Sequence, residues 1–238
     1  MGLGVWALAA TRLPEVLLPG PDDVLQGVIV HHERLAAATW TTLQASLGGL
    51  LIAVVAAACG ATLFLRSHWV EVALYPYALL VQTVPIVAIA PLLVVWLGYG
   101  LPVATVTAGI VAFFPLLTSA NLGLRSADPA QLELLQLYGA SWTATLVKLR
   151  LPAALPFVFS GLRTAVGLAV IGAVVGEFVG STGHPPCLGY LVLQSARSAD
   201  TALTFATIFV TAGLALGLFA AVRAAERRII GPWHGERG

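Results

Sequence analysis

The sequence predicts an all-α polytopic membrane protein, and composition, charge and the length of its uncharged runs all support that fold class. Of the 238 residues, 58% are hydrophobic and only 10% are charged, with a mean hydropathy of +0.91. Soluble domains carry about 25% charged residues, so this composition excludes a water-soluble globular enzyme. The net charge of +1 gives no basic surface for nucleic acid, and membrane lipid is the expected surrounding.

Uncharged runs locate the membrane-spanning helices. Such a helix needs about 20 mainly apolar residues, because the hydrocarbon core is about 30 Å thick. Residues 72–124 carry no charge and are long enough for two crossings, with a Gly- and Pro-rich turn at 98–102 between them. We therefore expect five spans, at residues 43–65, 73–97, 102–122, 156–180 and 201–222.

The N-terminal residues 1–38 form an interfacial segment in this interpretation. Only residues 2–10 are apolar before Arg12, which is too short to cross a bilayer, and no basic region precedes them as in a signal peptide. A turn near residues 18–23 should open a short helix at 22–30. The membrane domain then covers residues 39–222, with a polar loop at 125–152, and residues 223–238 form a tail.

Positive charges set the orientation, because they concentrate in the short loops on the cytoplasmic side. If the 125–152 loop is cytoplasmic, three of the 12 cations lie outside, namely Arg12, Arg34 and Arg197. The other nine lie inside: Arg66, Arg125, Lys148, Arg150, Arg163, Arg223, Arg227, Arg228 and Arg237. The tail is then cytoplasmic and the N-terminal segment is outside, which suggests that a first helix is missing from this reading frame.

The 125–152 loop predicts a helical hairpin on the cytoplasmic face. Asp128 is a good N-cap with Pro129 at the first helical position, and Gly139 should end that helix in a left-handed conformation. A second short helix should begin at Ser141 and stop at Leu151-Pro152, before the fourth span. A compact polar hairpin in this position is suited to docking into a partner.

The hairpin resembles the cytoplasmic "EAA" signature of ABC importer permeases, E-A-A-x-x-x-G-x9-I-x-L-P. Glu133, Gly139 and the closing Leu151-Pro152 fall at the family's spacing. Leu134 and Leu135 stand where the family has its two alanines, and Leu149 where it has isoleucine. The resemblance implies that a separate ATPase docks here, through Glu133, Leu134, Leu135, Tyr138, Gly139, Ala140, Leu149, Leu151 and Pro152.

The resemblance covers most of the chain and points to permeases of the nitrate, sulfonate, taurine and pyrimidine-precursor type. Its landmarks include Leu18-Pro19-Gly20-Pro21-Asp22-Asp23-Val24, Gln82-Thr83-Val84-Pro85, Gly139-Ala140-Ser141 and Gly176-Glu177-Phe178. Family members usually have six helices in the type I importer permease fold, and residues 5–10 resemble the end of their first. The resemblance implies a bacterial cytoplasmic membrane protein, paired with a second copy, that receives solute from an extracytoplasmic binding protein. ATP and Mg²⁺ would belong to the ATPase, and this chain would hold no cofactor.

Four residues are candidates for the solute pathway or its gate. Gln82 and Thr83 are polar at membrane depth. Pro85 and Pro91 free backbone carbonyls in the same span, and we expect a kink there. Glu177 is an acid among apolar turns, for which a structural hydrogen bond, a gate and a proton site are all open. The proton site would make the chain a proton-coupled secondary transporter, the alternative function, although we find no inverted repeat.

Enzymatic chemistry is not expected. The only lysine, Lys148, lies between Val147 and Leu149, so the phosphate-binding Gly-Lys-Ser/Thr sequence of a P-loop is absent. Neither Cys59 nor Cys187 has a Cys or His at metal-ligand spacing, and no histidine pair has helical zinc spacing. A membrane-embedded enzyme would need a nucleophile with its base or a metal cluster, and the sequence offers neither. The sequence does not identify the solute, or whether the second permease is identical.

Overall fold

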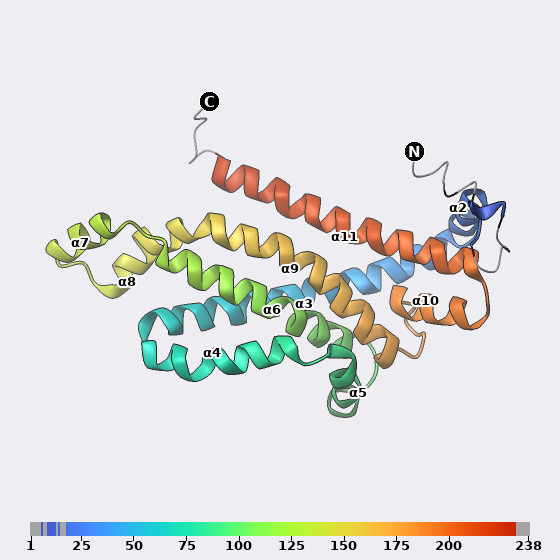
Figure 1. Ribbon diagram of the computed structural model, residues 1–238, viewed down its shortest axis with the longest axis horizontal. Helices are drawn as coiled ribbons and strands as arrows, with labels where there is room; N and C mark the ends of the chain where they lie inside the picture. Colours follow the sequence, from blue (N-terminus) through green and yellow to red (C-terminus); the bar gives the residue numbers. More distant parts are fainter. Residues whose placement is uncertain (1–5, 7–8, 13, 15–17, 232–238) are drawn as a thin grey trace.

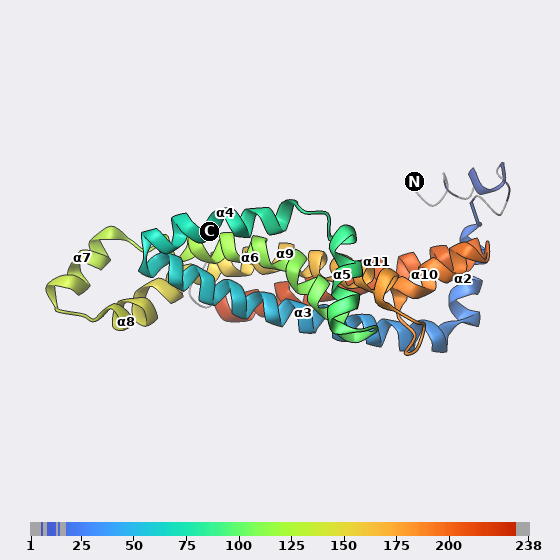
Figure 2. The ribbon, with the colours of Figure 1, turned by 90° about the horizontal axis from the view of Figure 1, so that it is seen from below.

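The computed structural model describes Trp6, residues 9–12, Pro14 and residues 18–231, and these residues form helices and turns without a β-strand (Figure 1). The helices make an elongated bundle, with α7 and α8 at one end and α2 and α10 at the other, as both views show (Figures 1 and 2). In chain order the elements are α2 (Pro21–Val30), α3 (His32–Arg66), α4 (His68–Thr83), α5 (Ile86–Leu97), α6 (Leu101–Arg125), α7 (Pro129–Leu137), α8 (Trp142–Thr145), the π-helical turn η1 (Leu146–Arg150), α9 (Leu151–Gly180), α10 (Leu188–Arg197) and α11 (Thr201–Ile230).

Four helical segments are long and apolar enough to cross a membrane, and they match four of the expected spans. They are His32–Arg66, Leu101–Arg125, Trp142–Gly180 and Thr201–Ile230. The remaining expected span, 73–97, is two helices, α4 and α5, bent by 99°. Counting that bent pair as one span gives up to five.

The bend between α4 and α5 occurs at Val84-Pro85. Proline has no N–H to donate and excludes the preceding residue from the helical region, and Val84 accordingly has an extended ψ of 126°. The sequence predicts a kink at Pro85, and the structure makes it a complete break. Pro91, the other expected kink, lies within α5 and does not end it.

The helix boundaries extend beyond two of the expected segments. Helix α3 begins at His32, so residues 32–38 are the start of a helix that continues to Arg66. Helix α11 continues to Ile230, into the expected tail. The short outer helix predicted at 22–30 is α2, Pro21–Val30. The expected end of a first helix at 5–10 and residues 232–238 of the tail lie wholly or partly outside the described residues.

Helix α6 forms the centre of the bundle, where small residues bring it close to α3 and α9. A Cβ added at Gly172 would lie 2.8 Å from the Ala108 Cα, and one added at Gly49 would lie 2.5 Å from the Ala108 Cβ. These contacts are shorter than real Cβ contacts, so both neighbours approach α6 through glycine. On α11, by contrast, no atom of the described chain lies within 4 Å of a Cβ built at Gly213 or Gly217.

Candidate functional site

The hairpin between α6 and α9 has the capped first helix that the sequence predicts. Helix α7 begins at Pro129, and the Asp128 carboxylate accepts a hydrogen bond of 2.9 Å from the Ala130 N–H. At its other end Gly139 has φ +69°, in the left-handed region. The Ala140 N–H donates to the Leu135 carbonyl at 2.9 Å, which closes a Schellman turn.

The second hairpin helix differs from the prediction at its end. Ser141 caps α8 as expected, with its hydroxyl accepting from the Ala144 N–H at 3.2 Å. However, Leu151-Pro152 does not stop the helix, because the chain continues through η1 into α9 as one helical path from Trp142 to Gly180. The Leu151 N–H donates to the Leu146 carbonyl in this π turn, so the widened turn lies directly before Pro152, which has no N–H to donate. The hairpin therefore leads directly into a membrane helix.

The hairpin exposes apolar side chains at its tip. Leu137 is 85% exposed and Tyr138 is 82% exposed, and Leu134 is more than half exposed on the preceding turn. Glu133 beside them is also exposed, whereas Leu135, Ala140, Leu149 and Pro152 are partly buried and Leu151 is exposed near the hairpin base. Large apolar side chains projecting from a capped hairpin indicate an interaction surface.

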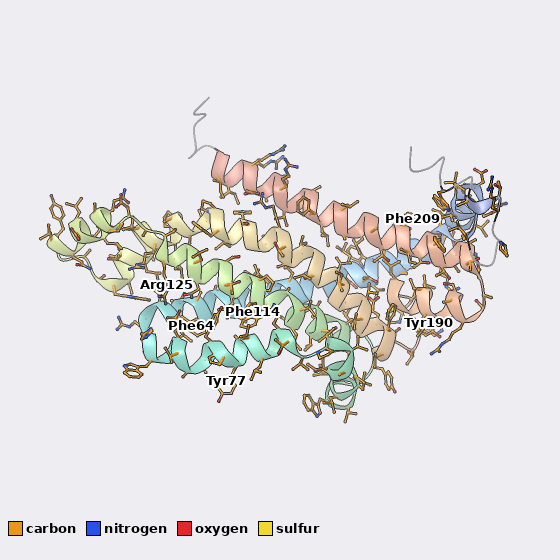
Figure 3. The ribbon with its side chains drawn as sticks, viewed as in Figure 1. Phe64, Tyr77, Phe114, Arg125, Tyr190 and Phe209 are labelled. Carbon is orange, nitrogen blue, oxygen red and sulfur yellow. The ribbon has the colours of Figure 1, made fainter. Side chains whose placement is uncertain are left out.

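A polar network holds the base of the hairpin to α4. The Arg125 guanidinium (Figure 3) contacts the Glu71 carboxylate at 2.6 Å, and the amide of Asn121 donates to the other Glu71 oxygen at 3.2 Å. This network was not predicted from the sequence. The sequence does contain a signal for it. Glu71 and Arg125 flank the uncharged residues 72–124, and two crossings return the chain to the same membrane face.

Two further arginines fix the hairpin to its neighbours. The Arg66 guanidinium at the end of α3 lies 5.1 Å from the centre of the Trp142 ring, a cation–π contact with α8. Arg150 donates to the Leu124 carbonyl at 2.9 Å, which joins the end of η1 to the end of α6. The hairpin is thus attached to α3, α4 and α6.

The structure brings three of the four pathway candidates together. Gln82, Thr83 and Pro85 line a cavity of about 330 Å³ between the α4–α5 break and helices α6 and α9, whose walls include Phe114 and Leu168. All three candidates are exposed in this single chain. The fourth candidate, Glu177, does not line this cavity.

Glu177 lies near the C-terminal end of α9 and is 3% exposed. One of its carboxylate oxygens, Oε2, accepts from the Thr42 hydroxyl at 3.1 Å and from the Gly189 N–H at 2.8 Å. The hydrogen bond to neighbouring helices, one of the roles that the sequence leaves open, is therefore present. Thr42 was not predicted as its partner, because α3 and α9 are far apart along the chain.

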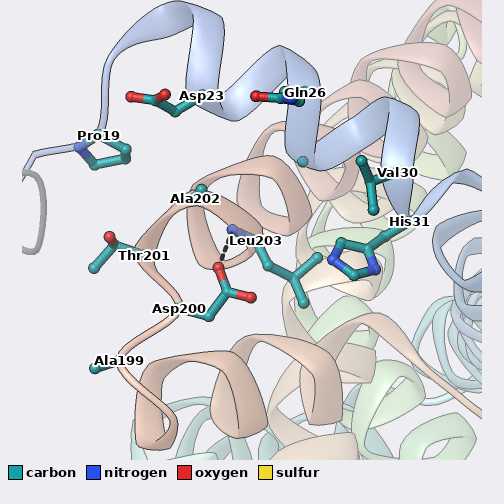
Figure 4. A pocket seen from close by; sticks show the side chains of 11 residues that line it. Pro19, Asp23, Gln26, Val30, His31, Ala199, Asp200, Thr201, Ala202 and Leu203 are labelled. Atoms are coloured by element: carbon teal, nitrogen blue, oxygen red, sulfur yellow. Dashed lines mark hydrogen bonds between the residues drawn. The ribbon is translucent and has the colours of Figure 1, made fainter.

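A polar groove of about 420 Å³ opens at the same end of the bundle, between α2 and the turn from α10 to α11 (Figure 4). Asp23 and His31 border it from α2, and Asp200 borders it from the turn. Asp200 also caps α11 by accepting from the Leu203 N–H at 3.0 Å. The groove lies at the opposite end of the bundle from the hairpin. Within the described residues, no group of His, Cys, Asp or Glu could hold a metal ion.

Comparison with known proteins agrees with this architecture. Residues 49–231 match the family described as binding-protein-dependent transport system inner membrane component. A probable ABC transporter permease protein of Haemophilus influenzae is 37% identical over 219 residues, covering 91% of this chain and 88% of the relative. The formylaminopyrimidine transport permease protein ThiX of Halalkalibacterium halodurans is 33% identical over 234 residues. The match covers 96% of this chain and 91% of the relative.

The taurine transport system permease protein TauC of Escherichia coli is 32% identical over 244 residues, covering 98% of this chain and 87% of the relative. The match to these relatives therefore extends along nearly the whole chain. Together with the helical bundle and the hairpin, it identifies a multi-pass protein of the bacterial inner membrane rather than an enzyme. The chain belongs to the binding-protein-dependent permease family of ABC transporters.

Proposed function

We propose that this chain forms half of the solute pathway of an ATP-driven importer, paired with a second copy of itself. A separate ATPase, which holds ATP and Mg²⁺, docks on the 125–152 hairpin, and an extracytoplasmic binding protein delivers solute to the outer end. Closure of the ATPase pair then shifts the permease between inward-open and outward-open states.

The observation that carries this proposal is the form of the hairpin. Exposed Leu137 and Tyr138 offer an apolar contact, and the caps at Asp128 and Gly139 give that contact a defined shape. The Arg66–Trp142 contact and the direct continuation into α9 join it to membrane helices. A surface that must transmit movement needs both an exposed contact and such attachments.

The pathway is assigned to the face that carries the α4–α5 break. Its cavity contains the polar side chains of Gln82 and Thr83 and the free backbone beside Pro85. Helices α4 and α5 also expose apolar side chains, including Leu80 and Val87, that a second copy would cover. Glu177 contributes from outside the cavity, as part of the outer gate.

The solute is assigned as a small polar organic molecule. Relatives along nearly the full chain are named for formylaminopyrimidine and taurine, which share small size and polarity but not charge. The cavity at Gln82 and Thr83 offers hydrogen-bonding groups and no ionisable side chain, which suits polar solutes of different charge. Uptake of labelled taurine and formylaminopyrimidine into proteoliposomes distinguishes these two chemistries.

Copurification tests the ATPase contact. The tagged chain, extracted in mild detergent, should retain an ATPase subunit, and Tyr138→Asp should lose it because a charge replaces the apolar contact. Trp69→Asp is the matched control, since Trp69 is 83% exposed against 82% for Tyr138 and lies on α4 outside the hairpin. Retention of the ATPase by Tyr138→Asp, or its equal loss from both variants, would contradict the assignment.

A further inference from the structure

The N-terminus of helix α10 is capped by side chains from two other helices. Its own N-cap residue, Cys187, makes no side-chain capping bond, although the first N–H groups of a helix need partners. The Leu188 N–H donates to the Thr42 hydroxyl at 3.0 Å, and the Gly189 N–H donates to Glu177 Oε2 at 2.8 Å. Helices α3 and α9 thus supply the cap that α10 lacks.

These bonds form one buried network. Thr42 also donates to Glu177 Oε2 at 3.1 Å, and Thr42 is fully buried. A buried N–H group without a partner is costly, so the Leu188 and Gly189 N–H groups favour the arrangement that keeps these bonds. The network is therefore a strong link between α3, α9 and α10.

Close packing at Gly189 makes the network possible. A Cβ added there would lie 2.6 Å from the Val174 carbonyl oxygen and 2.7 Å from the Glu177 Cβ. Any other residue would hold α10 away from α9 and lengthen the bond to Glu177. Glu177 also borders a cavity of about 10 Å³, which has room for about one water molecule near the carboxylate.

The network lies where two parts of the molecule meet. The helical path through α9 begins in the hairpin at Trp142 and ends at Gly180, just beyond Glu177. Helix α10 leads into Ala199 and Asp200, which border the outer groove. The bonds of Glu177 are thus a direct connection between the helix that starts at the hairpin and the helix that borders the groove.

We propose that Glu177 and Thr42 are positioning residues that fix α10 to the outer end of α9, so that movement of the hairpin reaches the outer groove. This inference rests on the proposed function, in which the ATPase docks on the hairpin and the binding protein docks at the outer end. The groove lies at that end. Glu177 then acts on the gate through α10 and not by contact with the solute.

The reactivity of the Cys187 thiol measures whether the cap is intact, so no cysteine has to be introduced. Its thiol is 2% exposed and donates to the Ser181 hydroxyl at 3.2 Å. Burial, with the nearby Glu177 charge, raises the pKa of Cys187 to about 11, so the thiol reacts slowly while α10 is in place. Only Cys59 would add background among the two cysteines of the chain, and Cys59→Ala removes it.

The first experiment measures maleimide labelling of Cys187 in the full chain in lipid nanodiscs, with Cys59→Ala throughout. Thr42→Val keeps the side-chain volume and loses both bonds, so labelling should be about tenfold faster or more, whereas Thr42→Ser should stay near the parent rate. Gly189→Ala, which keeps every bonding side chain, should also label faster. Equal rates in Thr42→Val, Gly189→Ala and the parent would overturn the cap.

The second experiment measures ATP hydrolysis of the transporter assembled with its ATPase, with and without the binding protein. Thr42→Val should bind the ATPase and keep basal hydrolysis but lose most of the stimulation by binding protein, and Thr42→Ser should restore it. Full stimulation in Thr42→Val, despite fast labelling of Cys187, would overturn the transmission role. Absence of stimulation in the parent would instead refute the proposed function, and the labelling result would still decide the cap.

Discussion

Substitution of Gly176 by alanine tests the packing on which the whole bundle depends. A Cβ at this position would lie 2.1 Å from the Thr107 hydroxyl oxygen and 2.7 Å from the Ala104 Cα. The hydroxyl is buried and hydrogen-bonded to the Val103 carbonyl at 2.8 Å, and the Ala104 atom is backbone, so neither moves without a shift of α6. Overpacking of this kind costs about 1–3 kcal/mol, against a gain of about 1 kcal/mol from helix propensity.

Gly167→Ala is the matched control on the same helix, because no atom lies within 4 Å of a Cβ built there. Gly167→Ala should gain only the higher helix propensity of alanine and should therefore raise the apparent Tm in detergent. Gly176→Ala should lower the apparent Tm by several degrees. Tryptophan fluorescence follows both melts, and size-exclusion chromatography checks that each variant starts folded. An unchanged or higher Tm in Gly176→Ala would refute the close α6–α9 packing.

Three further predictions concern the hairpin and its function. Gly139→Val should reduce solute uptake per ATP hydrolysed at equal membrane level, because a β-branched residue at φ +69° stores about 1–3 kcal/mol of strain, and unchanged coupling would refute this. Glu71→Gln should lower the free energy of unfolding by about 1 kcal/mol or less, since the Arg125 side chain is 44% exposed, and a much larger loss would show that the network is more than a surface ion pair. The purified chain without partners should not hydrolyse ATP, and measurable phosphate release by it would disprove a separate ATPase.

Much of the fold follows from the sequence, because membrane helices have a strong signal. Uncharged runs locate four spans, and capping residues such as Asp128 and Gly139 locate the hairpin turns, since both effects are local. Gly172, Gly176 and Gly180 are spaced four residues apart in the sequence, so they lie on one face of α9. The full break at Pro85 was predicted only as a kink, because its 99° bend depends on packing against α6 and α9.

The failures and omissions have a common physical cause. Pro152 reads as a helix stop, yet a π turn at residues 146–150 carries the helix through it, which depends on bonds five residues apart. Thr42 gives no signal in its own segment, because its importance comes from Glu177 and Leu188 on distant parts of the chain. Local patterns predict elements, whereas the outer polar network requires the three-dimensional arrangement.

Cross-linking from the hairpin tip tests the central claim most directly, that this hairpin is the contact with the ATPase. A cysteine introduced as Leu137→Cys, with Cys59→Ala, should cross-link to the ATPase subunit in native membranes, because Leu137 is 85% exposed at the hairpin tip. Tyr99→Cys is the control, since Tyr99 is 65% exposed but lies in the turn between α5 and α6, at the other end of α6. A cross-linked ATPase from Leu137→Cys and none from Tyr99→Cys is the expected result, and cross-linking from Tyr99→Cys alone would contradict the claim.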